Sequence, residues 1–470
     1  MTKTHTMGLP AGLLALQEQL GSQTVLIGDA VPERNRNDWS SQAPANPIAV
    51  IRPKDAGEVS AALKACAQAG LKVVPQGGLT GLCGGARPED GWVALSMERM
   101  VGVEEIDTAG STMTVWAGTP LEVVQREADQ AGLFFSLDLG ARGSCAIGGN
   151  LSTNAGGNRV IRYGMARELV LGIEVVLPDG TVLTSLNKML KNNAGYDLKQ
   201  LFIGSEGTLG VITRVVLRLH PKPQCTMAAL CAVSDFEALV GLLKAARTGL
   251  GPTLSAFEVM WPDYWHVVTE RAKVKAAVGK GHAQYVLIEA QGTDEKTDPP
   301  RFQAWLETVM AQGLLSDAAV AQSLADVQGF WALRDACAEF FQVIGPHVSY
   351  DVAMPIGQMA DFVRQCKAGL LAAGGVQSIY YGHVGDGNLH LVAWLDGASL
   401  IEQPKAAMDD VIYGLVKTCG GSISAEHGIG TQKKKWLGHS RSAEEIALMQ
   451  TLKKALDPGN LLNPGKVVSV

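Results

Sequence analysis

Three glycine-rich segments in the first half of the chain most constrain what it can fold into. They read PQGGLTGLCGGA (75–86), GSCAIGGNLSTNAGGNRVIRYG (143–164) and IGSEGTLGVIT (203–213). Successive backbone N–H groups without side chains form concavities that bind anions, and the serines, threonines and asparagines of these segments add further donors. One such segment alone is more often a tight turn. Three of them in one half of the chain predict a site that holds a diphosphate without lysine or arginine.

Two common nucleotide-binding folds do not fit this pattern. The chain contains no G-x-x-x-x-G-K-[ST] segment, which argues against a P-loop nucleotidase. It also contains no G-x-G-x-x-G that opens a strand-to-helix turn, which argues against a Rossmann site. The diphosphate must therefore be held by a different architecture.

The second half of the chain carries a different pattern. It contains two units of strand, helix and strand, the second of which spans residues 349–394. The helix of that unit repeats apolar residues at helical spacing and ends at Gly374 and Gly375; these apolar residues are Met359, Phe362, Val363, Cys366 and Leu370. This pattern predicts an α+β module with an antiparallel sheet and helices on one side. With 470 residues the chain is too long for one core, and we place the boundary between its two main domains at Pro221 and Pro223, between residues 222 and 223.

The segment GHVGDGNLH (382–390) brackets a tight turn with His383 and His390. The segments on either side, QSIYY and HLVAW, are typical of strands, so a hairpin would bring the two imidazoles side by side. Glu426, in SAEHGIG (424–430), could add a carboxylate, and two histidines with one carboxylate are typical of a catalytic zinc, manganese or iron site. His427 points away from Glu426 if that segment is extended, which would leave it free to act as a base. A lone histidine is usually a core residue, but three of the nine histidines lie in these two loops, which favours a metal site.

The glycine segments resemble the FAD-binding segments of the vanillyl-alcohol-oxidase superfamily, which has a PCMH-type FAD-binding domain. They are most similar to its D-2-hydroxy-acid dehydrogenase branch, which includes D-lactate dehydrogenase, D-2-hydroxyglutarate dehydrogenase and the flavin subunit of glycolate oxidase. The resemblance covers about residues 45 to 467. It implies a two-domain α+β fold: an FAD-binding domain (45–222), and a substrate and metal-binding cap domain (223–470) whose C-terminal segment returns to the flavin. Before these domains, the pattern of residues 12–20 predicts a short amphipathic helix in an N-terminal helical segment (1–44).

The resemblance also implies residue roles. The diphosphate would lie against the first segment, the rest of FAD against the second and third, and the flavin edge near Asn463; the residues implied are Pro75, Gly77, Gly78, Thr80, Gly81, Ser144, Gly148, Gly149, Asn154, Glu206, Ile212 and Asn463. The first segment lacks a histidine for covalent attachment, so we expect non-covalent FAD, with a thioether to Cys83 or Cys145 as the alternative. In this branch the two histidines of GHxGDGNxH and the glutamate of EHG bind the metal.

The same resemblance implies a reaction. A 2-hydroxy acid would chelate the metal, which lowers the pKa of its hydroxyl; His427 would take the proton, and the C2 hydride would pass to the flavin. Arg334 matches the arginine that binds the substrate carboxylate, and a surface ion pair with Asp335 is the alternative reading. An electron-transferring flavoprotein, a cytochrome or a quinone would then accept the electrons, and a homodimer is a further expectation.

Three departures from the pattern bear on the substrate. Members specific for hydroxyglutarate carry a threonine, a lysine and an asparagine where this chain has Ala338, Ser349 and Val392. A second carboxylate would lose a cation and two hydrogen-bonding partners, so we expect D-lactate or a similar monocarboxylate, with D-2-hydroxyglutarate dehydrogenase or the glycolate oxidase subunit as alternatives. Two other classes stay open, a flavin-free metallohydrolase and a non-catalytic flavoprotein subunit.

The charge and cysteine content of the chain narrow the classes of partner and cofactor that it could bind. A net charge of −6 argues against a nucleic-acid partner, and we expect the run Lys433 to Lys435 to be a solvated helix start. The eight cysteines form no C-x-x-C pair, which argues against an iron–sulfur cluster or zinc ribbon and fits a reducing compartment. No apolar leader or stretch of about 20 apolar residues is present. We therefore expect a cytoplasmic protein, with peripheral contact with a membrane left open.

Overall fold

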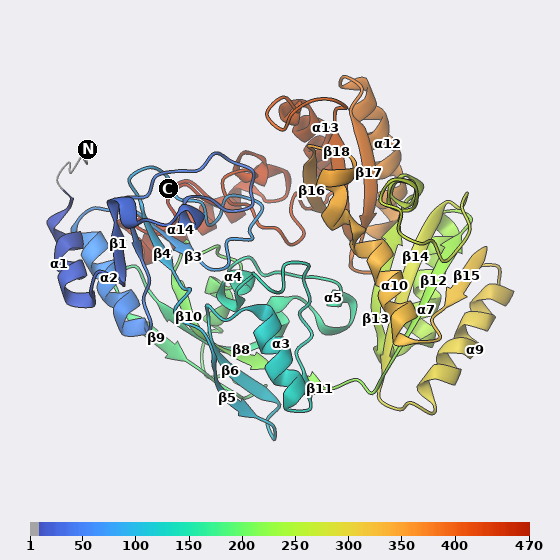
Figure 1. Ribbon diagram of the computed structural model, residues 1–470, viewed down its shortest axis with the longest axis horizontal. Helices are drawn as coiled ribbons and strands as arrows, with labels where there is room; N and C mark the ends of the chain where they lie inside the picture. The colour runs from blue at the N-terminus through green and yellow to red at the C-terminus, as the bar shows by residue number, and fades with distance from the viewer. Residues whose placement is uncertain (1–8) are drawn as a thin grey trace.

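The computed structural model describes residues 9–470. The first eight residues, part of the predicted segment 1–44, lie outside the described range. Figure 1 shows two bodies side by side, one built mainly from the first half of the chain and one from residues that follow β11. The predicted helix over 12–20 is α1 (Ala11–Leu20), and it packs against the next helix, α2 (Ala56–Gln68).

The first sheet has the strand order β1-β2-β4-β3. Its strands are β1 (Val25–Ile27), β2 (Ala49–Ile51), β4 (Val93–Ser96) and β3 (Val73–Gln76). The last three run parallel, as expected when α2 forms the crossover between β2 and β3. Asp55 caps the N-terminus of α2, and its carboxylate accepts the N–H of Glu58 at 2.9 Å. The first glycine segment follows the carboxyl end of β3. Sheets with parallel strands commonly bind ligands at that end of their strands.

The second sheet is antiparallel, with the strand order β5-β6-β10-β8-β9. Its strands are β5 (Val103–Asp107), β6 (Thr112–Trp116), β10 (Val211–Arg218), β8 (Val170–Val176) and β9 (Val182–Ser185), and β7 (Leu133–Phe134) pairs separately with β11 (His220–Pro221). A tight turn at Asp179-Gly180 joins β8 to β9 in a hairpin, and Gly180 has the positive φ of 83° that such turns require. The remaining helices of this half are α3 (Leu121–Gln130), α4 (Ile147–Ser152), α5 (Val160–Tyr163) and α6 (Lys199–Phe202).

The second half is built on a seven-stranded antiparallel sheet with the order β15-β12-β14-β13-β17-β18-β16. Its strands are β15 (Asp317–Val320), β12 (Cys225–Val233), β14 (Gln284–Gly292), β13 (Leu254–Met260), β17 (Gln377–Gly382), β18 (Asn388–Trp394) and β16 (Val348–Ala353). The predicted antiparallel sheet is confirmed. β17 and β18 form the hairpin expected around the GHVGDGNLH turn, with Tyr381 opposite His390.

Helices cover both faces of this sheet, so the prediction that they lie on one side is wrong. One face packs against α7 (Phe236–Gly249), α9 (Asp298–Ala311), α12 (Met359–Ala372) and α13 (Lys405–Thr418). The opposite face packs against α8 (Pro262–His266), α10 (Leu324–Asp335) and α11 (Phe340–Val343). The physical reason lies in the strands themselves, because β13, β14 and β18 are buried along their whole length and are not alternately apolar and polar.

After this sheet the chain returns to the first body. Helix α14 (Ala443–Leu456) and the residues after it lie against the first sheet in Figure 1. Asn463 donates its N–H to the carbonyl of Val73 in β3 at 2.9 Å, and Leu462 packs in the same core as β3. No helix within residues 9–470 is long and apolar enough to cross a bilayer.

Candidate functional site

A cavity of about 990 Å³ runs between the two bodies. The glycine segments of the first body line one end, and strands and loops of the seven-stranded sheet line the other. The predicted residues that line it are Pro75, Gly77, Gly78, Thr80, Gly81, Gly148, Gly149, Glu206, Ile212, Arg334, His383, His390, Glu426 and His427. The structure therefore brings most of the predicted cofactor, metal and catalytic residues to one space.

The glycine end has the properties of a cofactor cradle. A Cβ on Gly78 would overlap the carbonyl oxygen of Ser144, and one on Gly148 would lie 2.8 Å from the Cβ of Ala117, so only glycine allows these loops to approach each other. Among the described residues, the backbone N–H groups of positions 78 to 81 have no hydrogen-bond acceptor. The Asn150 side chain lines the same cavity, and its buried Oδ1 has no partner within the described chain. The free N–H groups fit a diphosphate, and the free Oδ1 of Asn150 fits an N–H or O–H donor of the same ligand; FAD has both kinds of group.

Three of the predicted cofactor residues have other contacts and do not line the cavity. They are Ser144, Asn154 and Asn463. The Asn154 Oδ1 accepts the N–H of Arg167 at 3.0 Å, and the Asn463 Nδ2 donates to the carbonyl of Glu206 at 2.7 Å. Both side chains hold cavity loops in place and do not face into the cavity, and no pattern in the sequence distinguishes those two roles.

Glu206 lines the cavity but also joins the two bodies. Its carboxylate accepts the backbone N–H groups of Ile429 at 2.7 Å and Gly430 at 2.8 Å. Burial raises the pKa of Glu206, although these two N–H groups act in the opposite direction. The third glycine segment is therefore tied to the loop that carries Glu426 and His427.

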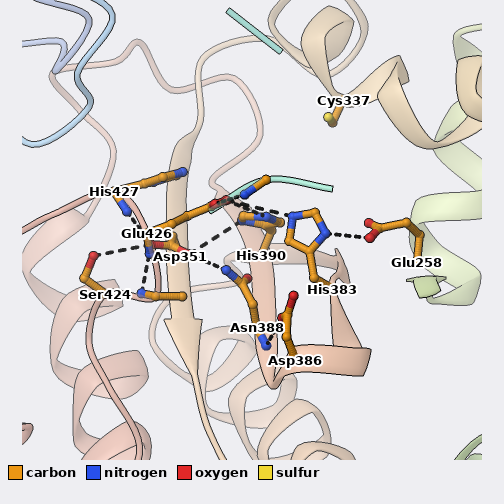
Figure 2. A network of polar contacts seen from close by, with 12 residues as sticks. Glu258, Cys337, Asp351, His383, Asp386, Asn388, His390, Ser424, Glu426 and His427 are labelled. Atoms are coloured by element: carbon orange, nitrogen blue, oxygen red, sulfur yellow. Dashed lines mark hydrogen bonds and ion pairs between the residues drawn. The ribbon is translucent and has the colours of Figure 1, made fainter. Parts of the chain in front are cut away.

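The predicted metal ligands converge, as Figure 2 shows. The Nε2 atoms of His383 and His390 lie 3.9 Å and 3.6 Å from the same oxygen, Oε1 of Glu426. The two imidazole rings stand edge to face with centroids 5.1 Å apart. Gly387, with φ of 89°, makes the turn that brings both histidines to this position. Two imidazole nitrogens and a carboxylate oxygen that face one point are the donor set of a catalytic divalent-metal site.

Each of these histidines has a carboxylate behind its other nitrogen. Glu258 Oε1 lies 2.6 Å from Nδ1 of His383, and Asp351 Oδ1 lies 3.9 Å from Nδ1 of His390. Such outer carboxylates typically orient metal-binding imidazoles. We did not predict Glu258 or Asp351 from the sequence, although an acidic residue inside the apolar strands LSAFEVM and SYDVAM is a usable signal, because a charge buried there needs partners.

Asp351 also organises the loop that carries Glu426, the third candidate ligand. Its Oδ2 accepts the backbone N–H groups of residues 425, 426 and 427 at 3.0, 2.9 and 2.9 Å. Donor atoms of Asp351, His390, Glu426 and His427 lie within 4.8 Å of one another, so Asp351 is close enough to be a ligand itself. We assign it to the outer sphere because its oxygens already accept these N–H groups and the amide of Asn388.

The electrostatics of the site follow from this arrangement. Burial acts against the charge of His383, but the neighbouring Glu258 carboxylate outweighs it and raises the pKa of His383 to about 9. Burial and the positive charge of His383 lower the pKa of His390 well below its usual value. Burial would raise the pKa of Glu258, but the charges of His383 and Arg334 lower it to about 2. Glu258 therefore stays ionised between the cationic groups of His383 and Arg334.

Arg334 and His427 flank this cluster. Arg334 is buried at the end of α10, and its Nε donates to Oε2 of Glu258 at 2.7 Å. Its Nη1 lies 3.9 Å from Asp335, so the surface ion pair considered as its alternative role is not its main contact. The His427 ring lies nearly parallel to that of His390, with centroids 5.9 Å apart, and it borders the cavity. An arginine and an imidazole thus stand beside the donor cluster, where they can bind an anion and accept a proton.

Two further sequence predictions can be compared with this region. Lys433 is buried and lies 3.9 Å from the Asp351 carboxylate, so the prediction of a fully solvated lysine run is wrong for its first residue. The buried carboxylate of Asp351 needs a cation nearby. A run of lysines in the sequence does not show which of them is buried beside such a carboxylate. Ala338 and Ser349 line the cavity, whereas Val392, a residue of β18, is buried in the core.

Comparison with known proteins places this geometry in a family. Residues 47–185 match the family described as FAD binding domain, and residues 222–467 match FAD linked oxidases, C-terminal domain. A D-2-hydroxyglutarate dehydrogenase of Xanthomonas citri pv. viticola is 39% identical over 97% of this chain and 96% of its own length. A putative mitochondrial D-lactate dehydrogenase of Schizosaccharomyces pombe is 36% identical over 92% of this chain and 84% of its own. Among solved structures, p-cresol methylhydroxylase has the same fold, with a TM-score of 0.79 at 17% identity over 97% of this chain and 96% of the other.

Proposed function

Since this chain belongs to the D-2-hydroxy-acid dehydrogenase branch of the FAD-linked oxidases, we propose that it oxidises D-2-hydroxyglutarate, or a closely related D-2-hydroxy acid, to the 2-oxo acid. The relatives support this choice, because several that are 38–39% identical to this chain carry the name D-2-hydroxyglutarate dehydrogenase. The observation that carries the proposal is the convergence of His383, His390 and Glu426 at the end of the cavity whose other end fits FAD.

A monocarboxylate such as D-lactate is the second candidate. Ala338 and Ser349 stand on the cavity wall where hydroxyglutarate-specific members carry a threonine and a lysine, so neither offers a cation to a second carboxylate. An unpaired buried carboxylate would cost several kcal/mol in order of magnitude. The similarity to a putative D-lactate dehydrogenase is consistent with this reading.

Different residues of the site would bind the substrate and accept its proton. Arg334 is fixed through its Nε, so its two terminal nitrogens can bind the substrate carboxylate in a bidentate manner. His427 would accept the proton of the substrate hydroxyl. His383, His390 and Glu426 would hold a divalent cation such as zinc, manganese or iron, which when bound would stabilise the deprotonated hydroxyl. FAD, when bound, would supply the acceptor for the C2 hydride.

The flavin would be held without a covalent bond. Burial raises the pKa of the Cys83 thiol to about 12 and also raises that of Cys145, which disfavours the reactive thiolate at both positions. The electron-transferring flavoprotein, cytochrome or quinone that would reoxidise FAD, the homodimer and the cytoplasmic location stay predictions from the sequence.

Steady-state assays with a dye acceptor test this function. We expect turnover with D-2-hydroxyglutarate, D-lactate and longer D-2-hydroxy acids in a ranked order of kcat/KM, and none with their L enantiomers. A higher kcat/KM for D-lactate than for D-2-hydroxyglutarate would select the second candidate. Absence of turnover with every D-2-hydroxy acid, in protein that carries FAD and metal, would overturn the proposal.

A further inference from the structure

We propose that Glu258 is a positioning residue that sets the geometry of the metal ligand His383 and of the substrate arginine Arg334 at the same time. This inference deepens the function proposed above and rests on it.

The placement of Glu258 explains how one side chain reaches both partners. It lies in β13, near the centre of the seven-stranded sheet, and is 1% exposed. β13 pairs with β17 through Val259 and Gly382, so His383 follows directly after the paired segment. Arg334 approaches from the end of α10, which covers the face of the sheet turned toward the cavity.

The two oxygens of the carboxylate have different partners. Oε1 lies 2.6 Å from His383 Nδ1, a contact drawn as a dashed line in Figure 2, and Oε2 accepts the Nε–H of Arg334 at 2.7 Å. With Nδ1 carrying the proton, the lone pair of His383 is on Nε2, which faces Glu426 and is the atom that a metal would need. Arg334 Nη2 lies 3.4 Å from that same Nε2, so the guanidinium is fixed next to the metal position.

Only a carboxylate satisfies both partners. His383 Nδ1–H and Arg334 Nε–H are both donors, and an ionised glutamate is an acceptor at both oxygens. A glutamine of the same shape would offer one acceptor and one NH₂ donor. Its NH₂ would face either the Nε–H of Arg334, which would then have to turn away, or Nδ1 of His383, which could accept it only if the imidazole proton moved to Nε2, the atom that a metal would need.

Glu289 provides a matched control in the neighbouring strand β14. It is also 1% exposed, and its carboxylate contacts Ser255 Oγ and Trp331 Nε1 at 2.8 Å each, and Arg159 Nε at 3.4 Å. Glu289→Gln therefore makes the same chemical change in the same sheet without touching His383 or Arg334. Glu258→Asp is a second test variant, because it keeps the charge but is one methylene too short to reach both partners.

The test measures zinc affinity of the FAD-loaded, chelator-stripped protein by competition with a chromophoric chelator, together with kcat and KM for the D-2-hydroxy acid. We expect Glu258→Gln to weaken zinc binding by about 10- to 100-fold and to raise KM, with FAD content unchanged. Glu258→Asp should show a smaller loss, and Glu289→Gln should bind zinc like the wild type.

Two results would overturn the role of Glu258: wild-type zinc affinity in both Glu258 variants, or an equal loss in Glu289→Gln. Failure of the wild-type protein to bind zinc, manganese or iron would instead overturn the metal site of the proposed function. The two failures are therefore distinguishable.

Discussion

Gly157 donates its backbone N–H to Oε2 of Glu426 at 2.7 Å, across 269 positions of the sequence. The other oxygen of this carboxylate, Oε1, faces the Nε2 atoms of His383 and His390. The second glycine segment of the FAD-binding half therefore orients the carboxylate of the candidate metal site. The cofactor end and the metal end of the cavity are joined by a single hydrogen bond at this point.

Gly156→Ala tests this connection. A Cβ at Gly156 would lie 2.7 Å from Oε2 of Glu426 and would push the carboxylate away from the histidines. We expect weaker zinc binding and a fall in kcat/KM by about tenfold or more, because a small displacement of a ligand changes the geometry that catalysis needs. Zinc titration and steady-state kinetics measure the two effects. Wild-type values for both would show that the carboxylate can move without loss.

His427→Ala should lower kcat by about 10²- to 10⁴-fold, since it removes the proposed general base. The flavin content should not change, because His427 borders the substrate end of the cavity. His266→Ala, at an exposed histidine of α8, is the control and should keep wild-type turnover. Undiminished turnover of the His427 variant would exclude this imidazole as the base.

Gly78→Ala should abolish FAD binding. The added methyl group would overlap the carbonyl oxygen of Ser144, and backbone on both sides prevents an easy shift. Gly329→Ala, in helix α10 where a methyl group meets open space, should retain the flavin and stabilise the fold by up to about 1 kcal/mol. Flavin absorbance per protein after gel filtration measures the difference. A Gly78 variant with full flavin content would contradict the cradle described for the first segment.

Because the side chain of Lys466 is buried, we expect the free energy of unfolding to depend on pH. Burial lowers its pKa to about 7, although Asp38, Glu89 and Glu206 act to raise it and Arg87 acts in the same direction as burial. In the unfolded chain a lysine has a pKa of about 10.4, so between these values the unfolded state binds more protons and the free energy of unfolding rises with pH.

Lys466→Met should remove that rise, whereas Lys435→Met, at an exposed lysine, should retain it. The measurement is the unfolding temperature of each variant between pH 7 and pH 9. An identical pH dependence in wild type and Lys466→Met would mean that Lys466 stays charged in the folded protein.

Much of this site could be predicted because its chemistry is local in the sequence. The hairpin that carries His383 and His390 follows from strand patterns on both sides of a glycine turn, and the structure confirms it. The glycine cradle likewise follows from three segments in which backbone must approach a ligand. The α+β fold and its antiparallel sheet were predicted on the same kind of evidence.

What escaped prediction depends on contacts between distant strands. Glu258 reaches His383 across 125 positions and Asp351 reaches the loop of His427 across 76, and no local pattern encodes such pairing. Helices on both faces of the sheet were missed because apolar runs in strands such as LSAFEVM do not by themselves show what covers each face. Asn154 and Asn463 were predicted to contact the cofactor because they match positions of the family that do so. In the structure their side-chain amides form hydrogen bonds within the protein instead.

The most direct test of the account is anaerobic reduction of the bound flavin by substrate, with and without chelator. We predict that D-2-hydroxyglutarate or another D-2-hydroxy acid bleaches the flavin absorbance, that the L enantiomer does not, and that chelator abolishes the bleaching until zinc or manganese is restored. Bleaching that is equally fast in the chelator-stripped protein, or equal for both enantiomers, would contradict a metal held by His383, His390 and Glu426 beside the flavin.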